Sequence, residues 1–257
     1  MLAPASARGD GSDAAYPFQV LFAAESRHFW FTSRAALVSW AATRYFPRAS
    51  SLLDLGCGTG SLLAALATRR ESVRLTGADA LVDGLRYARQ RLTNVELLQL
   101  DARRLPFRDE FDVVGAFDVL EHLDDDQDVL RQMHAALRPG GGILVTVPQH
   151  QWLWSRADDF AHHRRRYARR DLVQRVERAG FIVLRTTSFT TLMLPVMAAS
   201  RVLDRLRTAP YDPEAELRVG SSVNTLARGL SWIERAAIQA GISWPIGGSR
   251  LLVAEKR

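Results

Sequence analysis

Strand-like and helix-like segments alternate from residue 51 to residue 148, and this alternation constrains the fold more than any other feature of the chain. Five short apolar runs predict strands, and the segments between them carry apolar residues at helical spacing. The predicted strands lie at 51–55, 73–78, 95–100, 111–117 and 143–147. Such alternation favours right-handed crossovers and therefore predicts a Rossmann-like, doubly wound α/β sheet, mostly parallel, with helices on both faces.

The flanking segments complete this sheet. A helix is expected over 33–45, and the run 138–142, reading RPGGG, is expected to end the helix before the fifth strand. The rest of the chain predicts a loop region at 149–169, a helix at 171–179, a strand at 181–187, an irregular helical segment at 189–248 and a closing strand at 250–254. We therefore expect seven strands, with an extra helical segment before the last strand.

The domain organisation follows from this order of elements. We expect a disordered tail over 1–15 and a single domain over 16–257. Within that domain, 51–148 is the predicted cofactor-binding core, 149–248 the substrate side with the helical insertion, and 249–257 the closing strand.

Composition excludes several classes of protein. With 47% hydrophobic and 24% charged residues, the chain is typical of a globular protein with a substantial core. The lone cysteine, Cys57, cannot form an internal disulfide. No apolar run approaches the ~20 residues that span a bilayer, and the N-terminus lacks the basic and apolar regions of a signal peptide. We therefore expect a cytoplasmic protein.

The charge is unevenly distributed. The net charge is +6, but residues 51–148 carry −4 and residues 149–257 carry +8. A basic surface suggests nucleic acid, a membrane surface or an anionic substrate as partner. The strip 164–170, reading RRRYARR, is most simply a solvated face. The alternatives are a clamp for phosphate or carboxylate groups and a nucleic-acid contact.

A glycine-rich turn follows the first predicted strand and precedes a helix. It contains Gly56, Gly58 and Gly60, with Asp54 just before it. Glycine lets the backbone turn tightly and approach a ligand closely, and the helix N-terminus offers unpaired N–H groups. Asp79 ends the next strand 19 residues after Gly60, close to the ~20 expected of an acid that binds ribose hydroxyls. The pattern predicts a site for a nucleoside-bearing cofactor.

The details of this turn favour a cationic cofactor. A dinucleotide fingerprint reads G-x-G-x-x-G and places a pyrophosphate at the helix N-terminus. This chain reads G-x-G-x-G, and Asp54 suits an ammonium or sulfonium group better than a phosphate. S-adenosylmethionine has both cationic groups and no phosphate.

These motifs resemble those of class I S-adenosylmethionine-dependent methyltransferases, and the chain is most similar to the bacterial group that contains the ubiquinone-biosynthesis O-methyltransferases. The matching segments are the first motif at 52–60, Asp79, the pair Asp101–Ala102, FDVVGAFDVLEHL at 111–123 and LRPGGGILVTVP at 137–148. The motifs HFWFxxR at 28–34 and HxRRY at 163–167 recur in some subfamilies.

The resemblance implies a set of cofactor-binding residues. Arg34 would contact the carboxylate of the cofactor, Asp101 and Ala102 its adenine, and Phe117 would lie beside its methionine portion. The full predicted set is Arg34, Asp54, Gly56, Cys57, Gly58, Gly60, Asp79, Ala80, Asp101, Ala102 and Phe117. Plainer roles remain open: Asp79 as a helix cap, Asp101 and Arg34 as surface residues, and Cys57 as a small loop filler.

Methyl transfer requires a positioned nucleophile and a base for its proton, but no metal. The candidate catalytic residues are His122, His163 and Asp118, with His150 as a further candidate base. The acids at 124–126 could suggest a divalent metal beside His122, but an acidic run at a helix start is more often a cap. We therefore predict no metal site.

The expected function is S-adenosylmethionine-dependent O-methylation, by in-line transfer, of a small or lipid-like and anionic acceptor. One alternative is an RNA methyltransferase; another is a basic RNA- or membrane-binding protein with a vestigial cofactor pocket. Nucleic acid is disfavoured because 117–120 reads FDVL, where enzymes that methylate nucleobase amino groups carry an Asn/Asp-Pro-Pro-aromatic motif. Residues 189–207 could lie on the inner face of a membrane or pack on the sheet, and we favour packing. The oligomeric state stays open.

Overall fold

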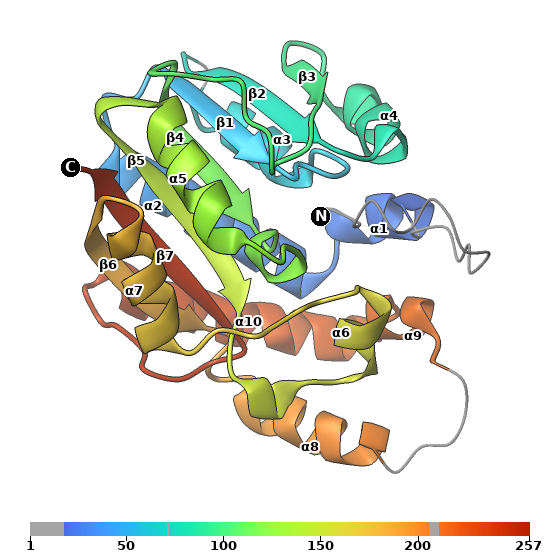
Figure 1. Ribbon diagram of the computed structural model, residues 1–257. Coiled ribbons are helices and arrows are strands. Elements are labelled where there is room, and N and C mark those ends of the chain that lie inside the picture. Colours follow the sequence, from blue (N-terminus) through green and yellow to red (C-terminus); the bar gives the residue numbers. More distant parts are fainter. Residues whose placement is uncertain (1–17, 71, 206–210) are drawn as a thin grey trace.

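In a computed structural model of the protein, seven strands form one sheet in the order β3-β2-β1-β4-β5-β7-β6 (Figure 1). The structure describes residues 18–257 apart from 71 and 206–210. The strands are β1 (Ser51–Leu55), β2 (Arg74–Asp79), β3 (Glu96–Gln99), β4 (Phe111–Phe117), β5 (Leu137–Pro148), β6 (Phe181–Phe189) and β7 (Ser249–Lys256). Strands β1 to β5 pair in parallel, and β7 runs antiparallel to β5 and β6. The predicted seven-stranded, mostly parallel sheet is confirmed.

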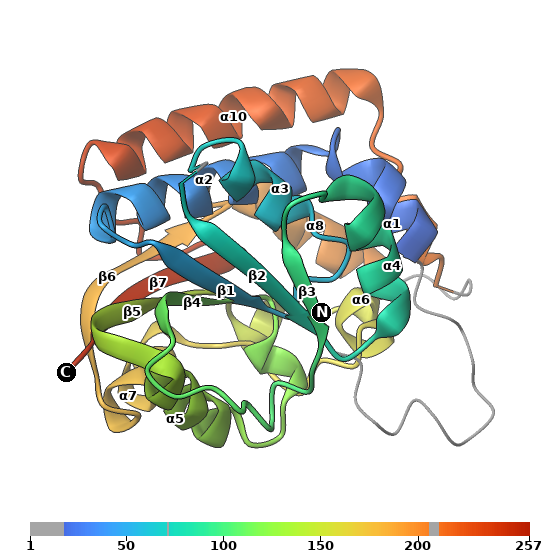
Figure 2. The same ribbon diagram turned by 90° about the horizontal axis from the view of Figure 1, so that it is seen from above.

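Helices cover both faces of this sheet. They are α1 (Phe18–Glu25), α2 (Phe29–Tyr45), α3 (Ser61–Ala67), α4 (Val82–Arg91), α5 (Asp126–Ala136), α6 (Arg156–Phe160), α7 (Arg169–Arg178), α8 (Leu194–Arg205), α9 (Pro213–Leu217) and α10 (Ser221–Gln239). Figure 2 shows α2, α3 and α10 on one face and α5 and α7 on the other. Short 3-10 turns occur at Leu120–His122 (η2) and Gln151–Leu153 (η3).

Each face has its own apolar core. On one face, α2 and α3 bury Leu37, Val38 and Leu63 against the sheet. On the other, α5 and α7 bury Leu130 and Val176. Because strands such as β4 contribute to both cores, their sequence is apolar almost throughout. This explains why continuous apolar runs, rather than alternating ones, marked the strands.

Three elements differ from the sequence-based expectation. The RPGGG run at 138–142 does not end a helix but forms the start of β5. A Cβ on Gly142 would lie 2.3 Å from the carbonyl oxygen of Ala254, so glycine is required by the close approach of β7 rather than by a turn. Helix α2 begins at Phe29 because the His28 side chain accepts a hydrogen bond from the Trp30 N–H. The region 149–169 contains η3 and α6 rather than only loop.

The segment between β6 and β7 is helical, as predicted, but only part of it packs on the core. Helix α10 lies along α2, whereas α8 contacts η3 and lies away from the sheet (Figure 1). Among the residues the structure describes, no helix is both long enough and apolar enough to cross a bilayer. The predicted disordered tail at 1–15, and positions 206 and 207 of the predicted membrane segment, lie outside the described residues.

Asp112 joins three strands at the edge opposite the predicted site. One carboxylate oxygen accepts hydrogen bonds from the N–H and hydroxyl groups of Ser50 and Ser51, at 2.7–3.1 Å. The other lies 3.2 Å from Arg138. Burial by itself would raise the pKa of Asp112, but these hydrogen bonds outweigh it and lower the pKa to about 2.

Replacing Asp112 with asparagine should therefore lower the free energy of unfolding near pH 7 by about 1–2 kcal/mol. The lowered pKa means that the contribution is present above the unfolded pKa of about 4 and fades as the pH falls toward 2. Urea unfolding at pH 7, 4 and 2.5 would show the difference from wild type shrinking. Asp83→Asn, at an exposed pair on α4, is the control, and an equal deficit at all three pH values would contradict the interpretation.

Candidate cofactor-binding site

The glycine turn between β1 and α3 has the backbone conformation that its sequence predicts. Gly56, Gly58 and Gly60 all have positive φ angles, between 52° and 73°. The N–H groups of Gly56 and Cys57 bond to the Ala78 carbonyl at 2.7 and 3.0 Å, which fixes the turn to the end of β2. A Cβ on Gly60 would lie 2.7 Å from the Leu92 side chain. Glycine is thus required here by both conformation and space.

Asp79 holds this turn from the neighbouring strand. Its side chain is fully buried, and its two oxygens accept N–H bonds from Gly58 and Leu81, each at 2.8 Å. It does not cap α4, whose N-cap residue is Leu81.

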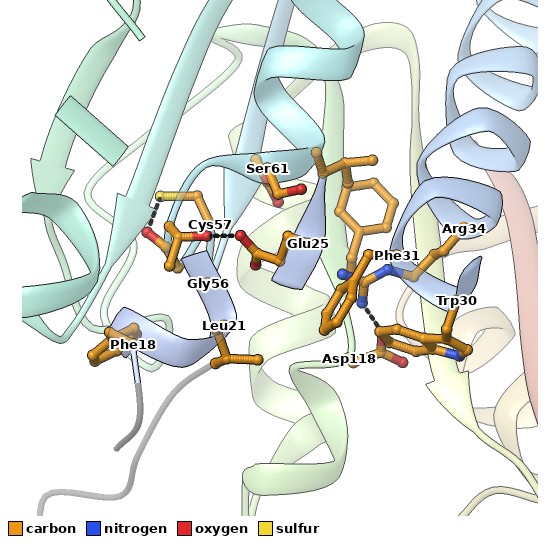
Figure 3. A pocket seen from close by; sticks show the side chains of 15 residues that line it. Phe18, Leu21, Glu25, Trp30, Phe31, Arg34, Gly56, Cys57, Ser61 and Asp118 are labelled. Atoms are coloured by element: carbon orange, nitrogen blue, oxygen red, sulfur yellow. Dashed lines mark hydrogen bonds and ion pairs between the residues drawn. The ribbon is translucent and has the colours of Figure 1, made fainter. Parts of the chain in front are cut away.

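A pocket opens between the glycine turn, α1, α2 and the end of β4 (Figure 3). The predicted site residues that line it are Arg34, Asp54, Gly56, Cys57, Gly58, Phe117 and Asp118. The predicted site residues that do not line it are Gly60, Asp79, Ala80, Asp101, Ala102, His122 and His163.

Asp101 and Ala102, which do not line the pocket, contact other parts of the protein. Asp101 accepts a forked pair of hydrogen bonds from Arg103, at 2.6–3.0 Å, which lowers the pKa of Asp101. Ala102 is buried in the apolar core on the α5 face. An adenine ring placed here would therefore meet a carboxylate that is already paired.

Asp54 gives the pocket its most unusual electrostatic feature. The side chain is 2% exposed, and burial raises its pKa to about 7. Its Oδ1 atom has no hydrogen-bond partner among the described residues. A buried acceptor without a partner is costly, so the pocket suits a ligand that brings a cationic or hydrogen-bond-donating group to Asp54.

Arg34 and Asp118 form an ion pair at the other side of the pocket (Figure 3). The Arg34 guanidinium also stacks over the Trp30 ring, 4.3 Å from its centroid. Each partner's side chain is only 13% exposed, so the alternative that Arg34 is a surface helical residue is wrong. Asp118 has a positive φ of 57°, and its N–H bonds to the Thr146 carbonyl at 2.8 Å, which fixes its place beyond β4.

Cys57 is a small buried residue of the turn. It is 8% exposed and packs in the core on the α2 face. Burial raises the pKa of its thiol well above the usual range, so the thiolate that a nucleophile needs is disfavoured. The loop-filler interpretation is the one that this environment supports.

Helix α1, which the sequence pattern did not reveal, closes the pocket beside the glycine turn. Glu25 of α1 accepts hydrogen bonds from the Thr59 hydroxyl and, at 2.8 Å, from Arg91 of α4. Arg91 also donates to the Phe22 carbonyl at 3.0 Å and lies over the Phe22 ring. These contacts join residues far apart in the chain, and no local spacing rule could have identified them.

Two of the three predicted imidazole bases, His122 and His163, lie against each other. His122 is 3% exposed, and burial, with His163 adding to it, lowers its pKa well below the usual range. The two rings meet edge to face with centroids 4.7 Å apart. Beside them, burial and the nearby Asp118 raise the pKa of Glu121. His150 lies elsewhere, stacked on Trp152, and does not line the pocket.

Two arginines of the basic strip 164–170 pair with acids of the run 124–126. Arg164 pairs with Asp124 at 3.2 Å and Arg165 with Asp126 at 2.9 Å. Arg166, 7% exposed, binds Asp158 at 2.8 Å. Arg165 and Arg166 are therefore held against buried acids, whereas Arg164, with a side chain that is 43% exposed, lies with Arg169 and Arg170 on the solvated face that the sequence suggested. The Asp125 side chain accepts a bond from the Asp128 N–H, which confirms the predicted cap of α5.

Comparison with known proteins gives the family. Residues 22–186, more than half of the chain, match the model of a methyltransferase domain family. The trans-aconitate 2-methyltransferase of Azoarcus sp. (strain BH72) is 36% identical over 101 residues, which is 39% of this chain and 40% of that protein. A ubiquinone biosynthesis O-methyltransferase of Pseudomonas paraeruginosa is 33% identical over 116 residues, 43% of this chain and 49% of that protein. The matches span less than half of the length of these curated relatives.

A solved structure shows the same fold. The phosphoethanolamine N-methyltransferase 2 of Haemonchus contortus, in complex with S-adenosyl-L-methionine, superposes with a TM-score of 0.56 at 19% identity. The superposition covers 85% of this chain and 52% of that chain.

The chain belongs to the methyltransferase domain family. Its motifs and relatives place it among the class I S-adenosylmethionine-dependent methyltransferases, a family whose cofactor is S-adenosylmethionine.

Replacing Arg91 with methionine should loosen α1 from the glycine turn, because the buried Glu25 loses its cationic partner. Amide hydrogen exchange over residues 18–25 should accelerate about tenfold or more, while exchange in β4 stays unchanged. Arg86→Met, on the same helix but in a pair with Asp83 that is about 70% exposed, should leave both unchanged. Equal exchange of α1 in the two variants would show that the contact does not hold the helix.

Proposed function

We propose that the protein transfers a methyl group from S-adenosylmethionine to an oxygen atom of a small or lipid-like, anionic acceptor. The observation that carries this proposal is the pocket itself. It has a buried, unpaired Asp54 oxygen beside the glycine turn and the Arg34–Asp118 pair at its other side. A cationic amino-acid cofactor needs a carboxylate side chain for its ammonium or sulfonium group and a cationic side chain for its carboxylate.

The cofactor residues are proposed accordingly. The glycine turn at 56–60 approaches the cofactor, Asp79 binds the ribose hydroxyls, and Asp54 faces a cationic group. Arg34 binds the carboxylate, Phe117 lies beside the methionine portion, and Ala80 and the pair Asp101–Ala102 border the nucleoside. The left-handed glycines and the unpaired Asp54 oxygen fit these roles.

When bound, S-adenosylmethionine supplies a methyl group already activated by the sulfonium. The chain's residues then need only place the acceptor oxygen in line, exclude water and receive a proton. Asp118 is proposed to position the acceptor, since it lines the pocket between Arg34 and the end of β4. His122 and His163 are the proposed proton-accepting groups. Asp158 Oδ1 lies 2.8 Å from His163 Nδ1, so the other ring nitrogen of His163, Nε2, points away from Asp158.

The acceptor class rests on the names of relatives and on side chains near Asp118. The relatives include methyltransferases named for trans-aconitate, demethylmenaquinone and ubiquinone biosynthesis. Trp30 and Phe31 give the pocket an apolar wall, and Arg34 gives it a cation. The pairing of Arg165 and Arg166 with buried acids leaves fewer cations of the strip available to a nucleic acid.

We also propose that 189–207 contacts a membrane surface. The sequence favoured packing on the sheet, but α8 exposes Val196, Val202 and Leu203 by more than half. An amphipathic helix with such a face can lie in the interface of a bilayer. This contact would suit a lipid-like acceptor, and pelleting with anionic vesicles tests it.

Calorimetry should detect binding of S-adenosylmethionine and S-adenosylhomocysteine, with no binding of NAD. Asp79→Asn should weaken this binding by about 1.5–3 kcal/mol, or about 10- to 150-fold in Kd, because charge-assisted hydrogen bonds are lost. Asp83→Asn on α4, with an exposed side chain, is the matched control. Unchanged affinity in Asp79→Asn would remove this residue from the site.

Cofactor affinity should depend on pH through Asp54. A cationic ligand favours the charged carboxylate, so binding lowers the pKa of Asp54 from about 7 in the free protein. Affinity should be constant well above pH 7 and fall by up to about tenfold per pH unit below it. Titrations between pH 5.5 and 8.5 measure this, and Asp54→Asn should flatten the profile. A flat wild-type profile would contradict the role of Asp54.

The acceptor is tested by following S-adenosylhomocysteine release with a panel of compounds. The panel should hold hydroxylated carboxylic acids, prenylated phenols, amines and transfer RNA. Turnover with the hydroxyl compounds, followed by mass spectrometry of an O-methyl product, is the expected outcome. Turnover confined to amines or RNA would overturn the proposed acceptor while leaving the cofactor site intact.

A further inference from the structure

Three potential metal ligands from two distant parts of the chain meet close to Asp118. Glu121 and His122 belong to η2, immediately after β4, and His163 follows α6. One ligand atom from each of the three lies within 4.8 Å of the others. The Nε2 atom of His163 is 4.0 Å from Oε1 of Glu121.

The polar atoms of this cluster are buried and lack partners. Glu121 is fully buried and His122 is 3% exposed. The backbone of Ala161 lies near the His122 ring, but neither oxygen of Glu121 and neither ring nitrogen of His122 makes a well-formed hydrogen bond to a described residue. Buried polar atoms without a protein partner are uncommon, and a bound ion or an ordered water typically satisfies them.

A chain of hydrogen bonds orients His163 toward these atoms. Its Nδ1 lies 2.8 Å from Asp158 Oδ1. Asp158 also accepts bonds from the Ser155 N–H at 2.8 Å and from Arg166 Nη2 at 2.9 Å. Because Asp158 is held as an acceptor, the Nδ1 of His163 carries the proton and Nε2 keeps its lone pair. A carboxylate behind a histidine in this way is the usual second-shell arrangement of metal-binding histidines.

We propose that Glu121, His122 and His163 bind a divalent transition-metal ion. Two imidazole nitrogens with one carboxylate are typical of zinc and iron(II) sites, whereas magnesium and calcium prefer oxygen ligands throughout. Ligand atoms of one tetrahedral zinc ion lie about 3.3 Å apart, given zinc–ligand bonds of about 2.0–2.1 Å. Side-chain movements of about 1 Å would bring the three residues to that geometry.

Such an ion would join two segments of the substrate side. It would tie η2, which follows Asp118, to the segment between α6 and α7, where Arg166 already pairs with Asp158 of α6. With the metal bound, the ligating nitrogens of His122 and His163 are occupied, so they cannot take the proton that the methyl acceptor loses. The experiment below therefore also decides between these two roles of His163.

The test uses the full chain stripped with a chelator and titrated with Zn²⁺ or Mg²⁺ in a calorimeter. We expect one tightly bound zinc ion per chain, a raised Tm and no comparable response to magnesium. Cobalt(II) in place of zinc should give the visible absorption of a site with nitrogen ligands. Glu121→Gln, which keeps the shape of the side chain, should weaken zinc binding by at least tenfold.

His162→Asn is the matched control. It removes an exposed imidazole next to His163 at a position with a φ of 55°, a conformation that asparagine accepts. This variant should bind zinc as the wild type does. Equal zinc affinity in wild type and Glu121→Gln, or loss of binding only in His162→Asn, would overturn the proposal. S-adenosylmethionine affinity, measured on the same samples, separates this result from a failure of the cofactor site.

Discussion

The hydrogen bonds of the Asp79 carboxylate are the constraint on which the rest of the site depends. The group sits at the end of β2 and accepts the N–H of Gly58, so it holds the turn that follows β1. Ala78, one residue earlier, accepts two more N–H bonds from the same turn. Because β1 and β2 are parallel neighbours, their carboxyl ends meet at one edge, and this edge becomes a rigid support. The pocket forms where α1 and α2 cover that support (Figure 3).

Charge is organised differently on the two sides of this support. Beside the glycine turn, the acid Asp54 is buried with one oxygen unpaired. On the face that α5 and α7 cover, acids and arginines pair in a network in which Asp126 binds Arg165, Arg175 and the Tyr167 hydroxyl. Paired charges fix the positions of segments, whereas unpaired buried acceptors are available to a ligand. The unpaired groups therefore mark the places where ligands are proposed to bind.

Most of the fold could be predicted because its signals are local. Each strand of the core is a short apolar run, and each crossover helix has its own spacing and end signals, so their order alone implied the sheet. The exceptions had tertiary causes. The glycines at 140–142 indicate a turn in the sequence, yet they lie in β5. Position 142 needs a glycine because β7 passes too close for a side chain. Helix α1 is stabilised by Arg91 and Thr59, which no pattern within the helix itself could reveal.

The sequence by itself determined the family, the sheet and the glycine turn with its acids, since these depend on residues close together in the chain. Only the tertiary structure decided which side chains share a surface. It paired Arg34 with Asp118, bound Arg166 of the basic strip to Asp158, and brought His163 against Glu121 and His122. The physical reason is that hydrogen bonds and ion pairs act over a few ångströms of space. Once the sheet has brought the strand ends together, the strength of these contacts depends on the distance in space between the partners. The number of residues between the partners in the chain no longer matters.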